Sequence, residues 1–231
     1  MKVSVITVAF NSGSTILKTI ESVNEQDYTN YEHIFIDGCS TDNTCEIIKQ
    51  FSKNHLLISE KDEGLYDAMN KGLHHATGDI ICFLNSDDFY ADVDVLSKVV
   101  KKFQENNAEV VISNIGYVDE SNNNTRIYKG IGFKRWQCKL GFVPPHLGTF
   151  LSRKTVNSVG KFSLDYEIAS DFDYLLRVFY KTPETKVIEL NKITLFMTEG
   201  GLSTKNINSN WIITKDIYKS LKENNIYASI F

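Results

Sequence analysis

Strand-like and amphipathic helical segments alternate over the first ninety residues, and this alternation limits the folds that are open to the chain. Runs rich in β-branched and apolar residues are typical of buried strands, and they occur at 3–9, 32–37, 56–59 and 80–84. Segments with apolar residues on one helical face lie between them, at about 14–24, 42–52 and 65–75. Elements in this order form a mostly parallel, doubly wound sheet with right-handed crossovers. We therefore expect an α/β protein whose sheet is flanked by helices.

The second half of the chain is less regular and predicts a smaller, mixed or antiparallel portion. A helix is expected at about 93–106 and another at about 171–180, the second capped by Ser170. Strands are expected at 109–114, 147–151, 186–190 and 193–197, with a hairpin of 116–120 and 126–129. We expect a single domain over 1–231, with a ligand-binding half at about 1–115, a second half at about 116–205 and a helical tail at 206–231 packed on the domain.

Polar side chains follow each of the first four predicted strands: Asn11, Asp37, Glu60, Asp62, Asp87 and Asp88. The carboxyl ends of parallel strands meet at one edge of the sheet, where ligands bind in open α/β folds. Asp87 and Asp88 are adjacent, so one carboxylate could bind Mg²⁺ or Mn²⁺ while the other hydrogen-bonds a ribose hydroxyl. Capping of the next helix is the alternative for this pair.

Composition limits the class of partner. A net charge of −4 and a pI near 5.8 argue against a nucleic-acid partner. The four cysteines lack zinc-ligand spacing, and we expect them to be reduced. The sequence starts directly on a strand and has no apolar run of bilayer length. We expect a cytoplasmic protein that could attach peripherally to the inner face of the cell membrane through its tail, although the tail is not strongly basic.

Several segments resemble the signature motifs of the family 2 glycosyltransferases, in the family's order and at its spacings. They are 5–11, 36–44, 59–72, 84–88, 145–146 and 169–177. The resemblance covers about residues 3–205 and is closest to bacterial enzymes of exopolysaccharide (colanic-acid-type), capsule or O-antigen assembly. It implies a GT-A fold and an inverting, hexosyltransferase-type transfer that depends on Mn²⁺ or Mg²⁺. The implied donor is a nucleotide-diphosphate sugar, which we expect to be a UDP-sugar, and the implied acceptor is a saccharide or a lipid-linked saccharide.

The same resemblance assigns the reacting groups. Asp171 matches the general base that takes the proton from the acceptor hydroxyl, and stabilisation of a helix dipole is its alternative role. Asp88 would bind the metal, and Asp87 would bind the ribose or the metal. The motif Asn85-Ser86-Asp87-Asp88 is not a strict Asp-x-Asp, so the direct metal ligand stays open between the two carboxylates.

Residues of the nucleotide-sugar pocket are implied in the same way. Asp37 would accept the imide N–H of uracil, or it could instead start the turn that follows it. Tyr66 could line the donor pocket or belong to the core. The other residues expected at the nucleotide sugar are Ala9, Asn11, Asp67, Asn70, Lys71, Ser86 and Asp87.

Two weaker candidates lie on the acceptor side. His146 follows two prolines, and by the resemblance it lies near the acceptor or the metal, although a lone histidine is more often structural. Asp173 could contribute there, or it could complete a Ser-x-x-Asp capping pattern with Ser170. No histidine follows His146, so the C-terminal histidine that completes the metal shell of some related enzymes is missing.

Two other classes of protein stay open. A nucleotidyltransferase would call for a glycine-rich basic loop after the first strand, and Asn11–Ser14 supplies no basic residue. A non-catalytic sugar-nucleotide-binding protein could share the same fold. The number of subunits is not determined by the sequence.

Overall fold

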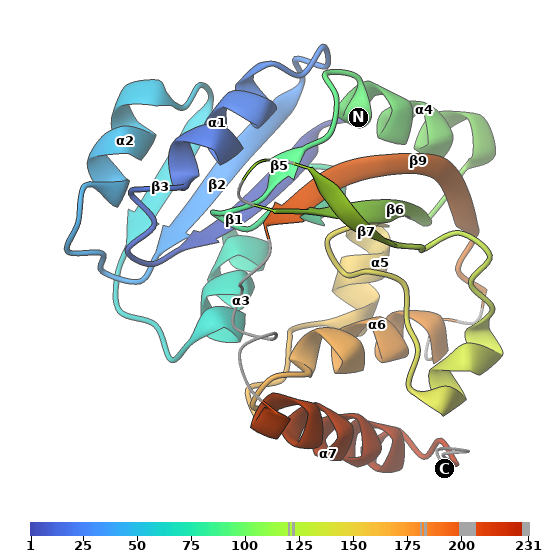
Figure 1. The fold of residues 1–231 in the computed structure, drawn as a ribbon. Coiled ribbons are helices and arrows are strands. Elements are labelled where there is room, and N and C mark those ends of the chain that lie inside the picture. The colour runs from blue at the N-terminus through green and yellow to red at the C-terminus, as the bar shows by residue number, and fades with distance from the viewer. Residues whose placement is uncertain (120, 122, 181, 183, 199–206, 228–231) are drawn as a thin grey trace.

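The computed structural model describes residues 1–119, 121, 123–180, 182, 184–198 and 207–227, and a single curled sheet runs through them (Figure 1). Its strands are β1 (Val3–Ala9), β2 (Tyr31–Asp37), β3 (His55–Ser59), β4 (Ile80–Phe83), β5 (Phe89–Tyr90), β6 (Val110–Val118), β7 (Asn124–Tyr128), β8 (Thr149–Ser152) and β9 (Val187–Thr198). The order across the sheet is β3-β2-β1-β4-β8-β6-β9-β5, and β7 pairs with β6. The helices are α1 (Ile16–Asn24), α2 (Thr44–Phe51), α3 (Leu65–His75), α4 (Val95–Asn106), the 3₁₀ helix η1 (Arg135–Leu140), α5 (Arg153–Val159), α6 (Ser170–Tyr180) and α7 (Ile207–Glu223).

The strands β3, β2, β1 and β4 form the parallel half of the sheet. Helices α1 and α2 lie over one face of this half, and α3 lies on the other (Figure 1). Alternate residues of β2 divide between the two faces: Phe35 packs with Ile16 and Ile48, whereas Ile34 and Ile36 join the main core. The expected α/β class, a mostly parallel sheet flanked by helices, is confirmed.

Helix α3 packs very closely on β1, and this contact fixes the helix relative to the ends of the strands. A Cβ atom at Gly72 would lie 2.3 Å from Cγ2 of Ile6, so only glycine fits there without a shift of the helix. The bounds of the elements up to β4 differ from the predicted ones by at most two residues, and those of α3 are as predicted.

The second half of the sheet is mixed. β6 runs antiparallel to β8 and parallel to β9, and β9 also pairs antiparallel with β5. The predicted hairpin is present, with Gly116 of β6 opposite Ile127 of β7. The prediction of separate strands at 186–190 and 193–197 is wrong, because β9 is continuous and its register shifts beside Ser113–Ile115 of β6. Residues 199–205 of the expected second half lie outside the described residues, as do 206 and 228–231 of the tail.

Three short elements were not predicted: β5, η1 and α5. β5 has two residues and exists through its pairing with β9. α5 has a local signal that the sequence analysis did not use, since the Ser152 hydroxyl caps the helix by accepting a hydrogen bond from the Thr155 N–H at 3.1 Å.

The tail forms α7, which lies beside α6 (Figure 1). It packs on the rest of the chain through both apolar and polar residues. Leu221 is buried, but Trp211 and Tyr218 are 76% and 59% exposed, and the polar residues Asp216 and Ser220 are buried. No helix in the described part of the chain has the length and apolar character needed to cross a membrane.

Candidate active site

The loops after β1, β2 and β4 are joined by hydrogen bonds at the carboxyl edge of the parallel half. Ala9 and Asp37 are paired at the ends of β1 and β2. Asn11 has a positive φ of 49°, and its side-chain oxygen accepts a backbone N–H from the loop after β2 at 2.9 Å. The hydroxyl oxygens of Ser12 and Ser86 are 2.8 Å apart, which joins the loop after β1 to the loop after β4. The fold therefore brings four predicted residues to one edge of the sheet: Ala9, Asn11, Asp37 and Ser86.

The Asp37 carboxylate is fully buried and is engaged within the chain. It accepts hydrogen bonds from the Ser40 N–H at 3.0 Å, from the Ser40 hydroxyl, and from the Ser59 hydroxyl at 2.6 Å. Burial opposes ionisation, but the hydrogen bonds from Ser40 and Ser59 outweigh it and lower the pKa of Asp37. Asp37 thus organises the turn after β2, which was the alternative role expected for it.

Asp87 and Asp88 lie in a tight turn directly after β4. The Asp88 carboxylate is 1% exposed and accepts hydrogen bonds from the Asn85 side chain at 3.0 Å and from the Thr198 N–H at 3.3 Å. Asp87 is more accessible, and its carbonyl oxygen accepts the Thr198 hydroxyl at 2.8 Å. Burial and the neighbouring charge of Asp87 raise the pKa of Asp88, and burial raises the pKa of Asp87.

This carboxylate pair fits a divalent cation in its donor chemistry. Mg²⁺ and Mn²⁺ take oxygen ligands and are commonly held by one or two carboxylates together with substrate phosphates and water. Burial raises both pKa values, and no lysine, arginine or histidine side chain of the described residues offsets it. No group of three His, Cys, Asp or Glu side chains suited to a metal occurs within the described ranges.

Helix α3 carries three more predicted residues, and all three are engaged with neighbouring loops. Lys71 forms an ion pair with Glu60 at 3.0 Å and donates to the Lys61 carbonyl oxygen at 2.7 Å. Asp67 lies 3.5 Å from Lys71. Asn70 is 8% exposed, and its amide forms two hydrogen bonds with the backbone of Phe162, at 2.8 and 2.9 Å. Asn70 thus holds the segment before α6 against α3.

Asp171 lies in the first turn of α6 and is partly buried. Its carboxylate accepts the Phe172 N–H at 2.7 Å, and the nearby Tyr66 hydroxyl also favours the ionised form. Burial outweighs these two effects and raises the pKa of Asp171, which is the direction that suits a general base. Its charge also reaches Tyr128 of β7, and burial and that charge raise the pKa of Tyr128 to about 12. The sequence analysis did not single out Tyr128.

A chain of aromatic rings links the β4 turn to Asp171. The His146 ring lies 4.9 Å from that of Phe83, at the end of β4, and 5.5 Å from that of Phe162. Phe162 in turn stacks on Tyr66 at 5.9 Å. Burial lowers the pKa of His146 to about 4, and its buried Nε2 has no hydrogen-bond partner among the described residues. A neutral imidazole with a free ring nitrogen therefore lies beside Phe83 and Phe162, in the chain of rings from the β4 turn to Tyr66.

The capping pattern expected for Ser170 and Asp173 is wrong. Ser170 is the first residue of α6, and its hydroxyl donates to the Ser163 carbonyl oxygen at 2.6 Å. Asp173 is 3% exposed and forms a salt bridge with Arg177 at 2.8 Å. Its other oxygen accepts hydrogen bonds from α7, so Asp173 holds the tail helix.

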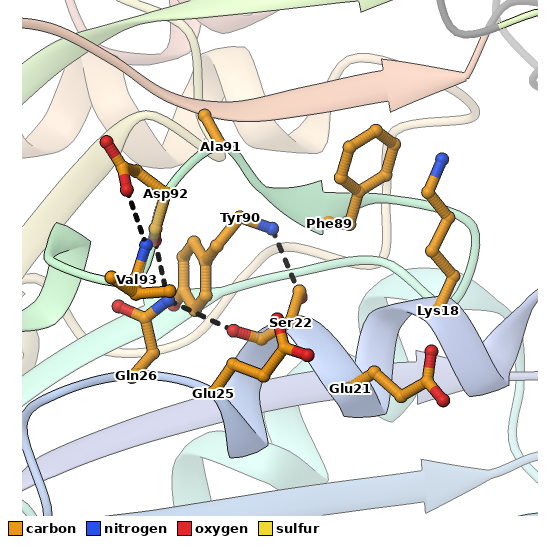
Figure 2. A pocket seen from close by; sticks show the side chains of 10 residues that line it. All are labelled: Lys18, Glu21, Ser22, Glu25, Gln26, Phe89, Tyr90, Ala91, Asp92 and Val93. Atoms are coloured by element: carbon orange, nitrogen blue, oxygen red, sulfur yellow. Dashed lines mark hydrogen bonds between the residues drawn. The ribbon is translucent and has the colours of Figure 1, made fainter.

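A separate depression of about 390 Å³ lies between α1 and β5. Figure 2 shows its lining, where Ser22 accepts the Tyr90 N–H at 3.1 Å and Gln26 donates to the Asp92 carbonyl oxygen at 2.8 Å. None of the predicted site residues lines it. The candidate active site is therefore the carboxyl edge of the strands together with the start of α6.

Comparisons with known proteins identify the family of this chain. Residues 4–161 match the model of the family described as "Glycosyl transferase family 2". The chain is 29% identical over 230 residues to a PGL/p-HBAD biosynthesis glycosyltransferase of Mycobacterium bovis, and the match covers 94% of this chain and 83% of that protein.

Two solved structures have the same fold at low sequence identity. S. aureus TarS, solved with UDP-GlcNAc, matches with a TM-score of 0.75 and 17% identity over 96% of this chain. The mannosyltransferase PcManGT of Pyrobaculum calidifontis, solved with GDP-Man and Mn²⁺, matches with a TM-score of 0.69 and 16% identity over 96% of this chain. The chain spans 66% of the crystallised TarS fragment, residues 1–349, and 64% of the crystallised PcManGT chain.

The sheet and its flanking helices define a protein of the glycosyltransferase class with a GT-A fold. The family match covers more than half of the chain, and the chain belongs to glycosyl transferase family 2.

Proposed function

We propose that this chain transfers a sugar from a nucleotide-diphosphate sugar, most simply a UDP-sugar, to a hydroxyl group with inversion at the anomeric carbon. The observation that carries the proposal is the Asp87–Asp88 pair at the end of β4, in which Asp88 is buried and neither carboxylate is offset by a positively charged side chain of the described residues. A divalent cation bound there would neutralise charge that develops on a leaving diphosphate. The Mn²⁺ present in the related mannosyltransferase structure supports this choice of group.

Asp87 and Asp88 are the residues that would hold Mn²⁺ or Mg²⁺. Both oxygens of Asp88 already accept hydrogen bonds, whereas Asp87 is more accessible. We assign Asp87 to a direct contact with the cation or the ribose. Asp88 would contact the cation only after one of its oxygens loses the hydrogen bond from Asn85 or Thr198. The loops that carry Ala9, Asn11, Asp37 and Ser86 would enclose the nucleoside. Asp67, Asn70 and Lys71 would shape the donor side from α3.

Asp171 is the proposed base. The acceptor oxygen forms a bond to the anomeric carbon while the bond from that carbon to the diphosphate oxygen breaks, and its electron pair leaves with the diphosphate. The proton of the acceptor hydroxyl passes to the Asp171 carboxylate, whose pKa is raised by burial. Attack from the face opposite the leaving group inverts the configuration. His146 lies beside Phe83 at the end of β4 and would shape the acceptor side of the site from there; its Nε2 is buried and would contact a ligand only after a local rearrangement.

The acceptor we propose is a saccharide or a lipid-linked saccharide of a bacterial surface polysaccharide. The M. bovis relative is named for PGL/p-HBAD biosynthesis, which supports a glycosylated product that is not a protein.

The exposed face of α7 supports peripheral attachment at the inner face of the cell membrane. Trp211 and Tyr218 lie two turns apart on that face, with Lys215 and Lys222 exposed beside them. Loss of flotation with phosphatidylglycerol vesicles in a Trp211→Ala, Tyr218→Ala variant would support the attachment, and unchanged flotation would contradict it.

Calorimetric titration of UDP, GDP and dTDP, with and without Mn²⁺, tests the donor site. We expect metal-dependent binding of UDP that is lost in Asp88→Ala and in Asp87→Ala. Glu105→Gln is the matched control, because Glu105 is an exposed carboxylate on α4. Equal binding with and without Mn²⁺ would contradict the metal site, and preference for GDP would change the donor class.

A further inference from the structure

The segment that carries Asp171 is held by α7. The Asp216 carboxylate, on α7, accepts backbone hydrogen bonds from the Ile168 N–H at 2.9 Å and the Ala169 N–H at 3.1 Å. Asp216 is 6% exposed. These two amides lie directly before α6, which starts at Ser170.

A carboxylate at this position stabilises the start of α6. The first amides of a helix have no partner within the helix, and a negative charge is favoured near them. The Ser170 hydroxyl donates to Ser163, so it does not fill this role. Asp216 instead supplies charge-assisted bonds from another helix, 45 residues further along the chain than Asp171.

A second contact fixes α6 on the other side of Asp171. Oδ1 of Asp173 accepts the Ser220 hydroxyl at 2.8 Å and the Asn224 side chain at 3.1 Å, both from the C-terminal end of the chain. Its Oδ2 binds Arg177 at 2.8 Å. Asp171 therefore lies between two points at which α7 is bonded to the same segment.

Helix α3 holds the opposite side of this backbone. The Ile168 carbonyl oxygen accepts the Tyr66 hydroxyl, while the N–H of the same residue donates to Asp216. The Tyr66 hydroxyl also lies near enough to the Asp171 carboxylate to favour its ionised form. A displacement of Ile168 would thus move the backbone before Asp171 and change its distance from Tyr66.

The contact between α7 and the rest of the chain contains buried carboxylates as well as apolar residues. Leu221 is buried and Ile217 packs against the core, and the carboxylates of Asp173 and Asp216 are buried where α6 and α7 meet. Burial of carboxylates carries a desolvation penalty, and well-packed apolar residues often give equal or greater stability. What the polar contacts add is a defined position of the α6 start relative to α7.

We propose that Asp216 is a positioning residue for glycosyl transfer: it fixes the backbone at Ile168 and Ala169 so that the Asp171 carboxylate meets the acceptor hydroxyl. This inference rests on the proposed role of Asp171 as the base. Asp216 itself contacts neither substrate nor metal. The donor site at the β4 turn is built from other elements, so its affinity for nucleotide should not depend on Asp216.

The test compares Asp216→Ala with Asp216→Asn in the full chain with Mn²⁺. Because the acceptor is unidentified, water serves as the acceptor, and release of UDP from UDP-glucose, UDP-galactose and UDP-N-acetylglucosamine is measured. We expect Asp216→Ala to lower kcat about 10- to 100-fold, as misplacement of a reacting group does. The KM for the donor and the calorimetric affinity for UDP should stay within about twofold, since the lost interaction acts on the chemical step. Asp216→Asn should restore most of kcat, because its amide oxygen can accept the same two N–H groups.

Glu223→Ala is the matched control. Glu223 also joins α7 to the segment before α6, through the Tyr166 hydroxyl at 2.6 Å, but it does not touch the backbone at Ile168 or Ala169. Hydrogen exchange gives a readout that needs no turnover: the amides of residues 168 and 169 should exchange faster in Asp216→Ala than in the wild type, Asp216→Asn or Glu223→Ala.

Three outcomes would separate the ideas. If Asp216→Ala had the kcat and the amide exchange of the wild type while Asp171→Asn was inactive, the positioning role of Asp216 would be overturned and the role of Asp171 would stand. An equal loss of kcat in Asp216→Ala and Glu223→Ala would also overturn it, because docking of the whole helix would then be the cause. Full activity of Asp171→Asn would instead overturn the proposed base.

Discussion

Thr198, the last residue of β9, bonds both members of the carboxylate pair: its hydroxyl donates to the Asp87 carbonyl oxygen at 2.8 Å and its N–H to Oδ1 of Asp88 at 3.3 Å. The two ends of this contact are 110 residues apart in sequence. A strand from the second half of the sheet thereby holds the turn in which the proposed metal ligands lie.

Thr198→Val should weaken metal-dependent binding of UDP without abolishing it. The hydroxyl bond to the turn is lost, and a hydrogen bond contributes about 1 kcal/mol, which is about fivefold in affinity. Thr198→Ser keeps the hydroxyl and should bind as the wild type does. Calorimetry with UDP and Mn²⁺ measures both, and equal affinity of Thr198→Val and the wild type would show that the turn holds its shape without this bond.

Asp88→Asn should stabilise the metal-free protein at neutral pH. Burial and the charge of Asp87 raise the pKa of Asp88 above its ordinary 3.8, so the folded chain keeps a proton that the unfolded chain has lost. The unfolding free energy contributed by Asp88 therefore falls as the pH rises from about 4 through the raised pKa. Asparagine does not titrate, so the variant should lack this fall. Urea unfolding between pH 4 and pH 8 in the presence of a chelator tests this, and parallel curves would contradict it.

His33→Gln should reduce the loss of stability in acid. His33 is fully buried, with Nε2 2.9 Å from the Thr7 hydroxyl oxygen, and burial, with a smaller effect of His55, lowers its pKa to about 3. Below pH 6.5 the His33 imidazole is protonated in the unfolded chain, whereas in the folded chain it stays neutral until the pH nears 3. The unfolding free energy thus falls by up to about 1.4 kcal/mol per pH unit over this window. Glutamine does not titrate there and can still hydrogen-bond Thr7. Thermal unfolding at pH 7, 6, 5 and 4 measures the difference in slope, which should vanish above pH 7.

Gly72→Ala should destabilise the fold although alanine favours helices. The new Cβ would lie 2.3 Å from Cγ2 of Ile6, and overpacking of this kind costs about 1–3 kcal/mol, more than the gain of about 1 kcal/mol in helix propensity. In an Ile6→Ala background the clash is absent, so the same substitution should be neutral or stabilising. Urea unfolding of the four variants in this cycle measures the coupling, and additive effects would contradict the steric explanation.

The sequence predicted the elements whose signals are local. β1 and β2 carry β-branched residues, and the apolar face of α3 is continuous from Ala68 to Leu73, so both period and length could be read directly. β5 could not be predicted, because two residues become a strand only through pairing with Phe196 and Leu195 of β9. The capping pattern at Ser170 and Asp173 failed for a related reason. Asp173 binds Arg177, and Asp216 on a distant helix binds the Ile168 and Ala169 amides before α6; nothing in the local pattern indicates the contact with Asp216.

For the candidate site, too, the features with a local signal could be predicted from the sequence. The strand-end residues Asn11, Asp37 and Ser86 meet at one edge because parallel strands bring their ends together. The residues that contact or face the site from other strands were not predictable. Ser59 bonds Asp37, Thr198 bonds Asp87 and Tyr128 faces Asp171, and their strands pair only in the folded sheet.

The place of β9 inside the sheet has a consequence for synthesis of the chain. The strands β1 to β4 leave the ribosome first and can pair among themselves, because every partner in that half lies within the first 83 residues. β6 and β5, by contrast, both pair with β9, which begins at Val187 and is synthesised later. During that interval the edge of β6 that β9 will cover is unpaired, and such edges are prone to aggregate. The turn that carries Asp87 and Asp88 also gains its last hydrogen bonds only when Thr198 arrives, so a nascent chain acquires this site late in translation.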